Sequence, residues 1–376
     1  MSLPMGKFPT MTMTTDVPAA APAAPSGGPP PRRRTPILQV LFGDLIAAGL
    51  TVLTAALLLS LLPALRWGVL DAVWSTADPG RCGGGGACWA FVAAKIRFIL
   101  FGVYPADEQW RPLTVIGLVL AMVLVSLPPR LWGRRLLMAW GVTVGAMLAL
   151  MWGGFAGLPF VSTANWGGLP VTLLLAILSL GLGFPVAVTL ALGRRSRIPV
   201  PRFLSVLVIE IIRGMPLVGL LFISSIMMPL LLPAGWTVDK LGRTLAALTI
   251  FAAAYLAEVI RGGLQGVPGG QMEAARALGI PVWKSVWHVV LPQAIQKVIP
   301  PLTNTAIVMV KNTSLVLIVG VFDMLSAGRT AASDPVWPAP YAEGYLFVGA
   351  VYFLICFAIS LYARWLEGRV QEKDNR

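Results

Sequence analysis

The chain alternates between long apolar runs and shorter polar connections. A membrane-spanning helix needs about 20 mostly apolar residues, and about eight runs approach that length. The predicted spans cover residues 42–65, 112–129, 135–153, 167–192, 203–233, 242–263, 297–322 and 344–366. This pattern predicts an all-α integral membrane protein with about eight transmembrane helices.

The composition supports a lipid environment. Hydrophobic residues make up 57% of the 376 residues and charged residues only 12%, about half the level of a soluble domain. Such a chain is also too apolar to be disordered as a whole. One His and three Cys leave too few ligands for a typical zinc site or a His-based triad. We therefore expect no metal site and no catalytic residue.

The net charge of +13 could indicate a nucleic-acid partner or the cytoplasmic loops of a membrane protein. A cytoplasmic N-terminus followed by eight spans places 20 of the 29 Lys and Arg inside and 8 outside, with Lys311 in a span. This distribution follows the positive-inside rule. We expect cytoplasmic N- and C-termini, including a tail over residues 371–376, and no nucleic acid.

Two segments outside the spans stand out. Residues 1–36 are rich in Ala and Pro and end in three arginines, a composition typical of a disordered tail. Residues 66–111 form a long periplasmic loop that contains Cys82 and Cys88. In an oxidising compartment these two could form a disulfide, but two free thiols in a loop explain them equally well.

A short cytoplasmic helix is predicted between the sixth and seventh spans. Gly and Pro over residues 262–270 end the preceding helix. Residues 271–278 are good helix formers, and Gly279 and Pro281 follow as stop signals. Small Ala274 and Ala275 would let another surface approach closely. The segment has the form of a knob on which a partner can dock.

The same segment resembles the EAA motif of ABC-importer permeases, which reads Glu-Ala-Ala, then Gly, then Ile-x-Leu-Pro. The matching residues are Glu273, Ala274, Ala275, Gly279, Val289, Leu291 and Pro292, with Val289 in place of Ile. In those permeases the motif docks on the ATPase. The resemblance assigns ATPase coupling to Gln271, Glu273, Ala274, Ala275, Arg276, Leu278, Gly279, Leu291 and Pro292.

Three further strings are similar to the polar-amino-acid permease family, which serves histidine, glutamine, glutamate, arginine and opine importers. They are Glu210 with Arg213-Gly214-Met215-Pro216-Leu217, then Ala254 to Glu258 with Arg261-Gly262-Gly263, and Lys311-Asn312-Thr313-Ser314-Leu315. Met215 and Asn312 replace the usual Thr and Asp. The resemblance covers residues 165–370. Three extra spans resemble the larger permeases of general L-amino-acid or glutamate/glutamine/aspartate/asparagine importers.

This resemblance implies an architecture and a set of partners. Residues 37–160 would hold three extra helices, and residues 161–370 the type I permease core of five, with the coupling helix near 270–280. The chain would form the translocation pathway of a binding-protein-dependent inner-membrane importer. Its partners would be a second homologous permease, an ATPase dimer and a periplasmic amino-acid-binding protein. No nucleotide-binding loop occurs in the sequence, so we expect no cofactor here and ATP on the partner.

The polar residues near or within the spans are candidates for a translocation path or gate: Glu210, Arg213, Pro216, Glu258, Arg261, Lys311, Asn312, Thr313 and Ser314. A charge at bilayer depth is costly unless it is paired or hydrated. Lys311 could meet a substrate carboxylate or pair with Glu258. Glu210 with Arg213, and Glu258 with Arg261, could form ion pairs along one helix, and these could equally brace a helix end. Pro216 predicts a kink or a helix start.

Other functions remain open at this point. An ATP-independent secondary transporter would also need charges in the membrane, although it has no use for a coupling helix. A scaffold or receptor subunit would not need Lys311. A membrane enzyme lacks a nucleophile–base pair. For the importer, acidic and amide amino acids or a broad L-amino-acid range are expected as substrates, with basic amino acids or opines as the alternative.

Overall fold

The computed structural model describes residues 37–76, 78–233 and 235–374. The expected tail over residues 1–36 lies outside the described residues. The expected C-terminal tail begins as helix, because the last helix continues to Asp374. Two compact units divide the chain after Leu62.

The first unit contains α1 (Ile37–Phe42) and α2 (Leu45–Ser60). The Thr51 hydroxyl donates to the Leu41 carbonyl at 2.7 Å, which connects the two helices. None of the residues of α2 is buried, and its sequence is apolar all round. A helix of this kind suits a lipid environment on every side.

The second unit is also helical, and its described residues form only two isolated β-bridges. Its elements are α3 (Leu62–Leu65, which begins at the division), η1 (Arg66–Leu70), η2 (Pro79–Gly83), α4 (Trp89–Phe101), η3 (Ala106–Glu108), α5 (Trp110–Ser126), η4 (Pro129–Leu131), α6 (Arg134–Trp152), η5 (Thr163–Asn165), α7 (Gly168–Arg194), α8 (Pro199–Gly214), α9 (Leu217–Phe222), η6 (Ile223–Met227), α10 (Met228–Leu231), α11 (Lys240–Gln265), α12 (Gly269–Ala277), α13 (Val282–Ser285), η7 (Val286–Val290), α14 (Leu291–Lys297), α15 (Ile299–Asn312), η8 (Thr313–Val319), α16 (Met324–Ala332) and α17 (Tyr341–Asp374).

The predicted all-α membrane fold is confirmed. Within the described residues, seven helices are long and apolar enough to span a membrane, or up to eight if one bent pair counts as a span. The bent pair falls within the predicted span over residues 203–233 and confirms the kink or helix start expected at Pro216, because α8 and the segment Leu217–Leu231 meet at 105°. Met215 is extended, with φ −96° and ψ 139°, as the residue before a proline prefers. Pro216 therefore breaks this span.

Helices α7 and α11 form the centre of the second unit. Small residues let their backbones approach closely, since a Cβ on Gly183 would lie 3.1 Å from the Thr249 carbonyl oxygen. Ala252 and Ala253 are buried opposite. Close packing through Gly and Ala is how helices associate in lipid, where no hydrophobic force drives them together.

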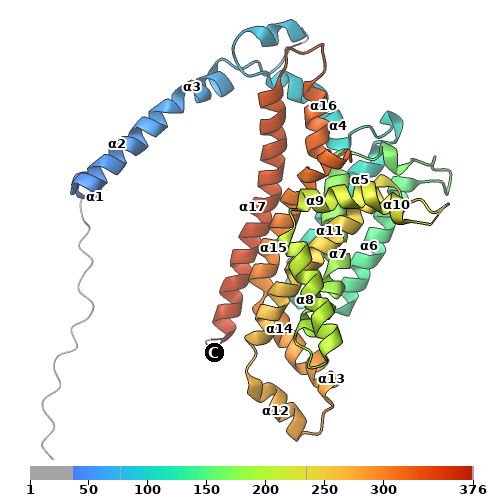
Figure 1. The fold of residues 1–376 in the computed structure, drawn as a ribbon. Helices are drawn as coiled ribbons and strands as arrows, with labels where there is room; N and C mark the ends of the chain where they lie inside the picture. Colours follow the sequence, from blue (N-terminus) through green and yellow to red (C-terminus); the bar gives the residue numbers. More distant parts are fainter. Residues whose placement is uncertain (1–36, 77, 234, 375–376) are drawn as a thin grey trace, which may run out of the picture. The chain divides into compact units, whose positions relative to one another are not determined.

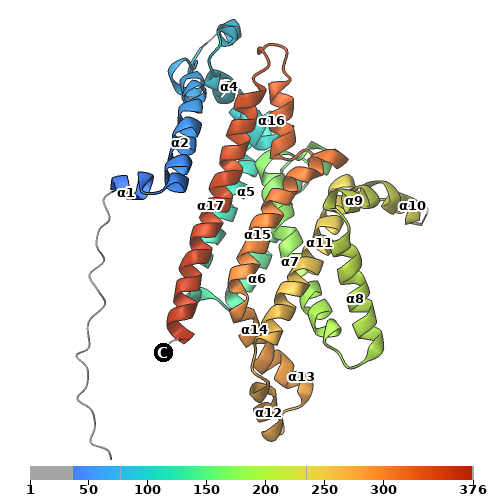
Figure 2. The same ribbon diagram turned by 60° about the vertical axis from the view of Figure 1, so that its left-hand side comes forward.

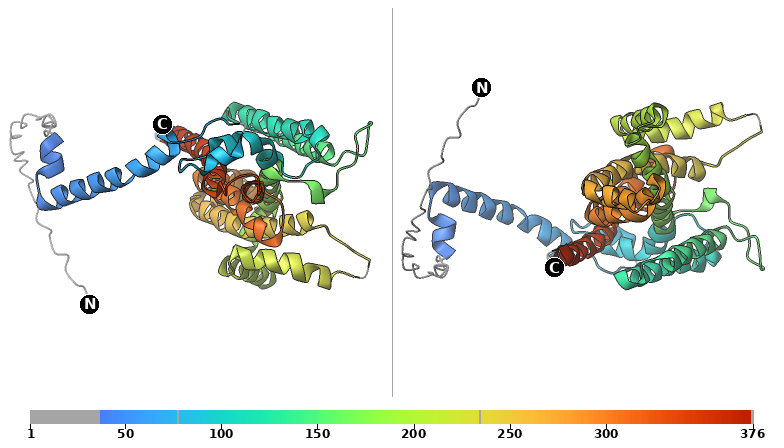
Figure 3. Two further views of the ribbon diagram at one scale, coloured as in Figure 1. Left: turned by 90° about the horizontal axis from the view of Figure 1, so that it is seen from above. Right: turned by 90° about the horizontal axis from the view of Figure 1, so that it is seen from below.

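The other helices surround this pair. Figure 3 shows α5 and α6 on one side of the central helices and α8 to α10 on the other. Figures 1 and 2 show α4 and α16 at one end of the unit and α12 and α13 at the opposite end. We call these the α16 end and the α12 end. The compact unit includes α4 to α6 as well as the later helices, and the division near residue 160 stays a prediction.

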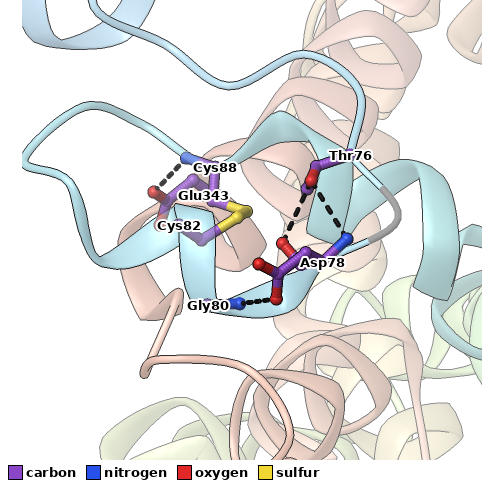
Figure 4. The surroundings of a disulfide bond; sticks show 6 residues. All are labelled: Thr76, Asp78, Gly80, Cys82, Cys88 and Glu343. Carbon is purple, nitrogen blue, oxygen red and sulfur yellow. Dashed lines mark hydrogen bonds between the residues drawn. A yellow bond between two sulfur atoms is a disulfide. The ribbon is translucent and has the colours of Figure 1, made fainter.

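The segment over residues 66–111 is more ordered than the loop that the sequence predicted. It contains η1, η2, α4 and η3 and leads into α5 at the α16 end. Cys82 and Cys88 form a disulfide, and the buried Glu343 carboxylate accepts a hydrogen bond from the Cys88 amide at 2.7 Å (Figure 4). Asp78 caps η2 within the segment by accepting from the Gly80 amide. The hydrogen bond from Cys88 to Glu343 joins the segment to α17.

Two charged contacts also hold the α16 end together. The Lys95 ammonium on α4 pairs with the Asp334 carboxylate after α16, and this hydrogen bond holds the pKa of Asp334 below its usual range. Arg111 on α5 is completely buried. Its guanidinium contacts the Glu108 carboxylate at 2.8 Å and donates to the Pro159 carbonyl at 2.8 Å. It therefore fixes the connection between α6 and α7.

Candidate functional site

Helix α12 lies at the outermost part of the α12 end, next to α13 (Figure 2). It spans nine residues, Gly269–Ala277, so the predicted helix is present and begins two residues earlier than the expected range 271–278. Ala275 is its one buried residue, whereas Gln271, Glu273, Ala274 and Arg276 are exposed. Most of the surface of this helix is therefore available to another molecule.

The turn that ends α12 explains why the EAA motif has a glycine at position 279. The Ile280 amide donates to the Ala275 carbonyl at 3.0 Å, and the Gly279 amide donates to the Arg276 carbonyl at 2.9 Å. Together these bonds form a Schellman motif, in which the residue after the helix takes a left-handed conformation. Gly279 has φ +74°, a region that is costly for residues with a side chain. The motif leaves Leu278 80% exposed at the tip.

Contacts with α14 hold α12 in place. The Gln293 side-chain amide donates to the Gln271 side-chain oxygen at 3.2 Å. The Lys297 ammonium donates to the Gly266 carbonyl at 2.8 Å, at the end of α11. Leu291 is buried, and Pro292 lies in the first turn of α14. Gln293 therefore contacts α12 itself, and Lys297 holds the end of α11 from which α12 follows, whereas the coupling role of Leu291 and Pro292 stays a prediction.

A second group of site candidates forms an ion network between α7, α8 and α11. Glu258 on α11 is its centre, with a side chain that is 16% exposed. Its carboxylate lies 3.0 Å from Arg194 on α7, 3.0 Å from Arg261 and 3.7 Å from Arg213 on α8. Arg213 also stacks over the Tyr255 ring at 5.6 Å. One carboxylate thus connects three helices.

The network corrects one predicted pair and confirms another. Glu258 and Arg261 form the expected contact three residues apart on one helix. Glu210, however, pairs with Arg194 at 2.8 Å rather than with Arg213, because α7 ends beside α8. Arg194 was not among the site residues predicted from the sequence. Its signal was its position in the last turn of a span, where a cation is favoured by the helix dipole.

Lys311 lies near the end of α15, within a candidate span. Its side chain is exposed, and no carboxylate among the described residues lies within 4 Å of it. The suggested pair with Glu258 is not formed, because Glu258 is occupied by three arginines. An exposed ammonium inside a membrane requires water, an anion or another polar group beside it. The face of α15 that carries Lys311 therefore does not suit contact with lipid.

The residues after Lys311 change the helix type. Asn312 ends α15, and Thr313 begins the 3₁₀ segment η8. The Thr313 hydroxyl is buried and donates to the Val310 carbonyl, and the Ser314 hydroxyl donates to the Lys311 carbonyl. Irregular helix at membrane depth is tolerated where the backbone is buried in protein or lines a cavity. Pro216 lies at the break of α8, away from this segment in the chain.

One buried carboxylate near η8 was not singled out from the sequence. Asp323 is fully buried and caps α16 by accepting from the Leu325 and Ser326 amides. It also accepts from the Tyr352 hydroxyl at 3.3 Å. Burial raises the pKa of this carboxyl, although its hydrogen bonds act in the opposite direction. The contacts indicate that Asp323 positions α16 against α17.

The sequence is similar to those of known proteins. Residues 183–372 match the family model described as a binding-protein-dependent transport system inner membrane component. The inner membrane amino-acid ABC transporter permease protein YhdY of Escherichia coli (strain K12) is 40% identical over 362 residues, which cover 94% of this chain and 98% of that protein.

Two more similarities cover smaller parts of the chain. The glutamate/glutamine/aspartate/asparagine transport system permease protein BztC of Rhodobacter capsulatus is 34% identical over 349 residues, which cover 77% of this chain and 80% of that protein. The crystal structure of an amino acid ABC transporter with histidines contains a chain that is 32% identical. That match covers 54% of this chain and 92% of the other, with a TM-score of 0.48.

Proposed function

Because the chain belongs to the family of binding-protein-dependent transport system inner membrane components, we propose that α12 couples it to an ATPase and that the Lys311 segment lines its path. It is the permease subunit of an amino-acid ABC importer and a multi-pass protein of the inner membrane. The α12 end faces the cytoplasm, with both termini on that side. This orientation follows the distribution of Lys and Arg.

The exposed helix α12 is the observation that carries the coupling role. Only Ala275 of its nine residues is buried, so the permease itself does not use most of this surface. Apolar side chains continue the surface beyond the helix, since Leu278, Val282 and Trp283 are 80%, 52% and 61% exposed. An exposed apolar patch with a polar rim is typical of a docking site. The ATPase subunit is its occupant.

Lys311 supports a path beside α15. The ammonium is exposed within a span, and an amino acid always carries a carboxylate that can pair with it. A second homologous permease would shield this face from lipid and complete the path. The chain itself binds no nucleotide, and ATP is hydrolysed on the partner.

The ion network around Glu258 is suited to a gate or brace at the α12 end. It joins the end of α7 to α8 and α11, just before the chain enters α12. Movement of α12 would be transmitted through α11 to this network. Separation of the helices would break the contacts of Glu258 and open the inner end of the path.

Acidic and amide amino acids, or a broad range of L-amino acids, are the proposed substrates. The relative BztC is named as a permease of a glutamate/glutamine/aspartate/asparagine transport system, and the positive Lys311 is compatible with an acidic side chain. Uptake of labelled glutamate, glutamine and arginine by vesicles that contain the whole importer tests this choice. Transport of arginine alone would replace it with the basic-amino-acid alternative.

Purification of the tagged chain in mild detergent, followed by mass spectrometry, tests the assembly. We expect an ATPase and a second permease in the purified complex. A chain that repeatedly purifies alone, even after cross-linking, would contradict both partners and favour an ATP-independent carrier.

Substitutions in α12 test the coupling role separately. Glu273→Lys changes the exposed surface, and Gly279→Val cannot adopt the left-handed turn without strain. We expect both variants to insert into the membrane but to lose most of the bound ATPase. Gly262→Ala is the control, because a Cβ at Gly262 meets nothing within 4 Å. Full ATPase retention and transport in both variants would refute the coupling role.

A further inference from the structure

A groove with a volume of about 330 Å³ lies where α5, α6 and α17 meet near the α12 end. Trp132, Leu136, Leu137, Trp140 and Tyr362 contribute to its lining. None of these residues belongs to α12, the ion network or the Lys311 segment. The groove is therefore separate from the site described above.

The polar atoms of the aromatic residues point into the protein. The Trp132 indole N–H donates to the Ser126 carbonyl at 2.8 Å, and the Trp140 indole N–H donates to the Ser126 hydroxyl at 2.9 Å. The Tyr362 hydroxyl donates to the Leu127 carbonyl at 2.9 Å. Because these groups already have partners, the rings offer mainly apolar surface to the groove. Such a lining suits a hydrocarbon chain better than a polar metabolite.

The depth of the groove places it at a membrane surface. Tyr362 follows the start of α17 at Tyr341 by a distance along the helix of about 30 Å, which equals the thickness of the hydrocarbon core. Trp and Tyr are enriched at this level of membrane proteins. An occupant of the groove would therefore have one end in the acyl region and one end among the headgroups.

Two arginines lie next to the lining residues of the groove along the chain. Arg130 and Arg134 flank Trp132 and Gly133 in the chain, and both are exposed. Neither has a carboxylate within 4 Å among the described residues, and the first turn of α6 contains no acidic residue. At 100° per residue, Arg134 lies about 60° around α6 from Leu137, and Arg135 lies about 100° from Leu136, so both arginines of this turn lie beside the lining of the groove.

We propose that this groove binds an anionic phospholipid from the leaflet on the α12 side. One acyl chain lies against Trp132, Leu137 and Trp140, and the phosphate and headgroup lie near Arg130 and Arg134. Basic pockets between membrane helices on the cytoplasmic side are suited to anionic headgroups. Charge complementarity at the rim and the apolar lining together select this occupant over a zwitterionic lipid or a second protein helix.

Native mass spectrometry of the complete complex tests the proposal with defined lipids. The protein is reconstituted in nanodiscs that contain equal amounts of dioleoylphosphatidylglycerol and dioleoylphosphatidylcholine, and the retained lipids are counted. We expect the wild type to retain phosphatidylglycerol preferentially. The double variant Arg130→Gln/Arg134→Gln should lower this preference by about fivefold for each arginine removed.

Arg202→Gln is the matched control, since it removes one exposed charge from α8, which lies on the other side of the central helices from α6 (Figure 3). We expect its lipid preference to stay within about twofold of the wild type, because salt screens a charge that is farther from the groove than about 10 Å. An equal loss in Arg202→Gln and in Arg134→Gln would overturn the proposal and indicate a diffuse surface charge. Equal retention of the two lipids by the wild type would also overturn it.

A variant that fills the groove tests the apolar part. Leu137→Trp adds a bulky ring at a residue that is already 74% exposed, so the fold should tolerate it. We expect it to lose the retained phosphatidylglycerol although Arg130 and Arg134 remain. Unchanged retention would show that the lipid lies elsewhere. The ATPase content of each sample, measured in parallel, reports on the proposed coupling role separately from lipid binding.

Discussion

Replacement of Glu258 by Gln is the strongest perturbation of the ion network. It removes the one carboxylate that contacts Arg194, Arg213 and Arg261. Of these three cations only Arg194 keeps a carboxylate partner, Glu210, whose side chain is 54% exposed. Removal of one partner from a buried ion pair costs about 3–5 kcal/mol. The arginines here are 24–37% exposed, so solvent screening reduces the expected loss to about 2–3 kcal/mol.

Thermal unfolding of the purified complex measures this loss. For a chain of this length, about 2–3 kcal/mol corresponds to a decrease in Tm of about 3 °C. Glu210→Gln is the control, because Glu210 is exposed and contacts a single arginine; its loss should stay below about 1 kcal/mol. Equal decreases in Tm for the two variants would refute the central role of Glu258.

The ATPase activity of the same samples separates a gate from a brace. If the network holds the inner end of the path closed, Glu258→Gln should raise ATP hydrolysis in the absence of substrate. If the network is only a structural brace, Tm should fall while the ratio of substrate-stimulated to basal hydrolysis stays unchanged. We expect the first result, since Glu258 joins α11, which leads into α12, to two other helices.

Three further predictions concern packing and the outer segment. Gly263→Ala should disrupt the contact between α11 and α14, because its Cβ would lie 2.6 Å from a backbone oxygen of α14. Gly262→Ala is the control, because its Cβ meets nothing within 4 Å. The Tm of Gly263→Ala should therefore be lower than that of Gly262→Ala. The pKa of Asp334 is lowered by its pair with Lys95. The pair therefore adds to the free energy of unfolding at a pH above the ordinary carboxyl pKa, and this contribution is lost as the pH falls through the lowered pKa. The Tm difference between wild type and Lys95→Met should therefore shrink in acid, and a constant difference from pH 7 to pH 3 would contradict it. Cys82→Ser opens a short disulfide loop and should cost about 2 kcal/mol, measured as a lower Tm that reducing agent does not lower further.

Local sequence signals predicted the parts of the molecule that depend on neighbouring residues. The apolar runs located the spans, because the length of such a run is set by membrane thickness. The helix formers between Pro268 and Gly279 predicted α12, and the structure places it over Gly269–Ala277. The proline at 216 predicted the interruption after α8, because a proline restricts the residue before it. Each of these signals acts within a few residues.

The partners of the charged residues depended on tertiary structure. Glu210 could pair with Arg213 by spacing alone, yet α7 places Arg194 beside it. Glu258 could have paired with Lys311, but the arrangement of α7, α8 and α11 gives it three arginines instead. The sequence limits which contacts are chemically possible, and the packing of distant helices selects among them.

The packing of distant helices also decided the state of Cys82 and Cys88 in the segment over residues 66–111 and the angle of the bend at Pro216. The sequence allowed Cys82 and Cys88 to be joined or free, whereas only the fold brings Glu343 to the Cys88 amide across 255 residues. Pro216 could break a helix at many angles, and the 105° bend comes from the packing of α9 and η6 on α11. The sequence by itself therefore determined the spans, the exposed α12 and the strings of its family. The tertiary structure decided the ion network, the isolation of Lys311 and the lipid groove, because their residues come from helices far apart in the chain.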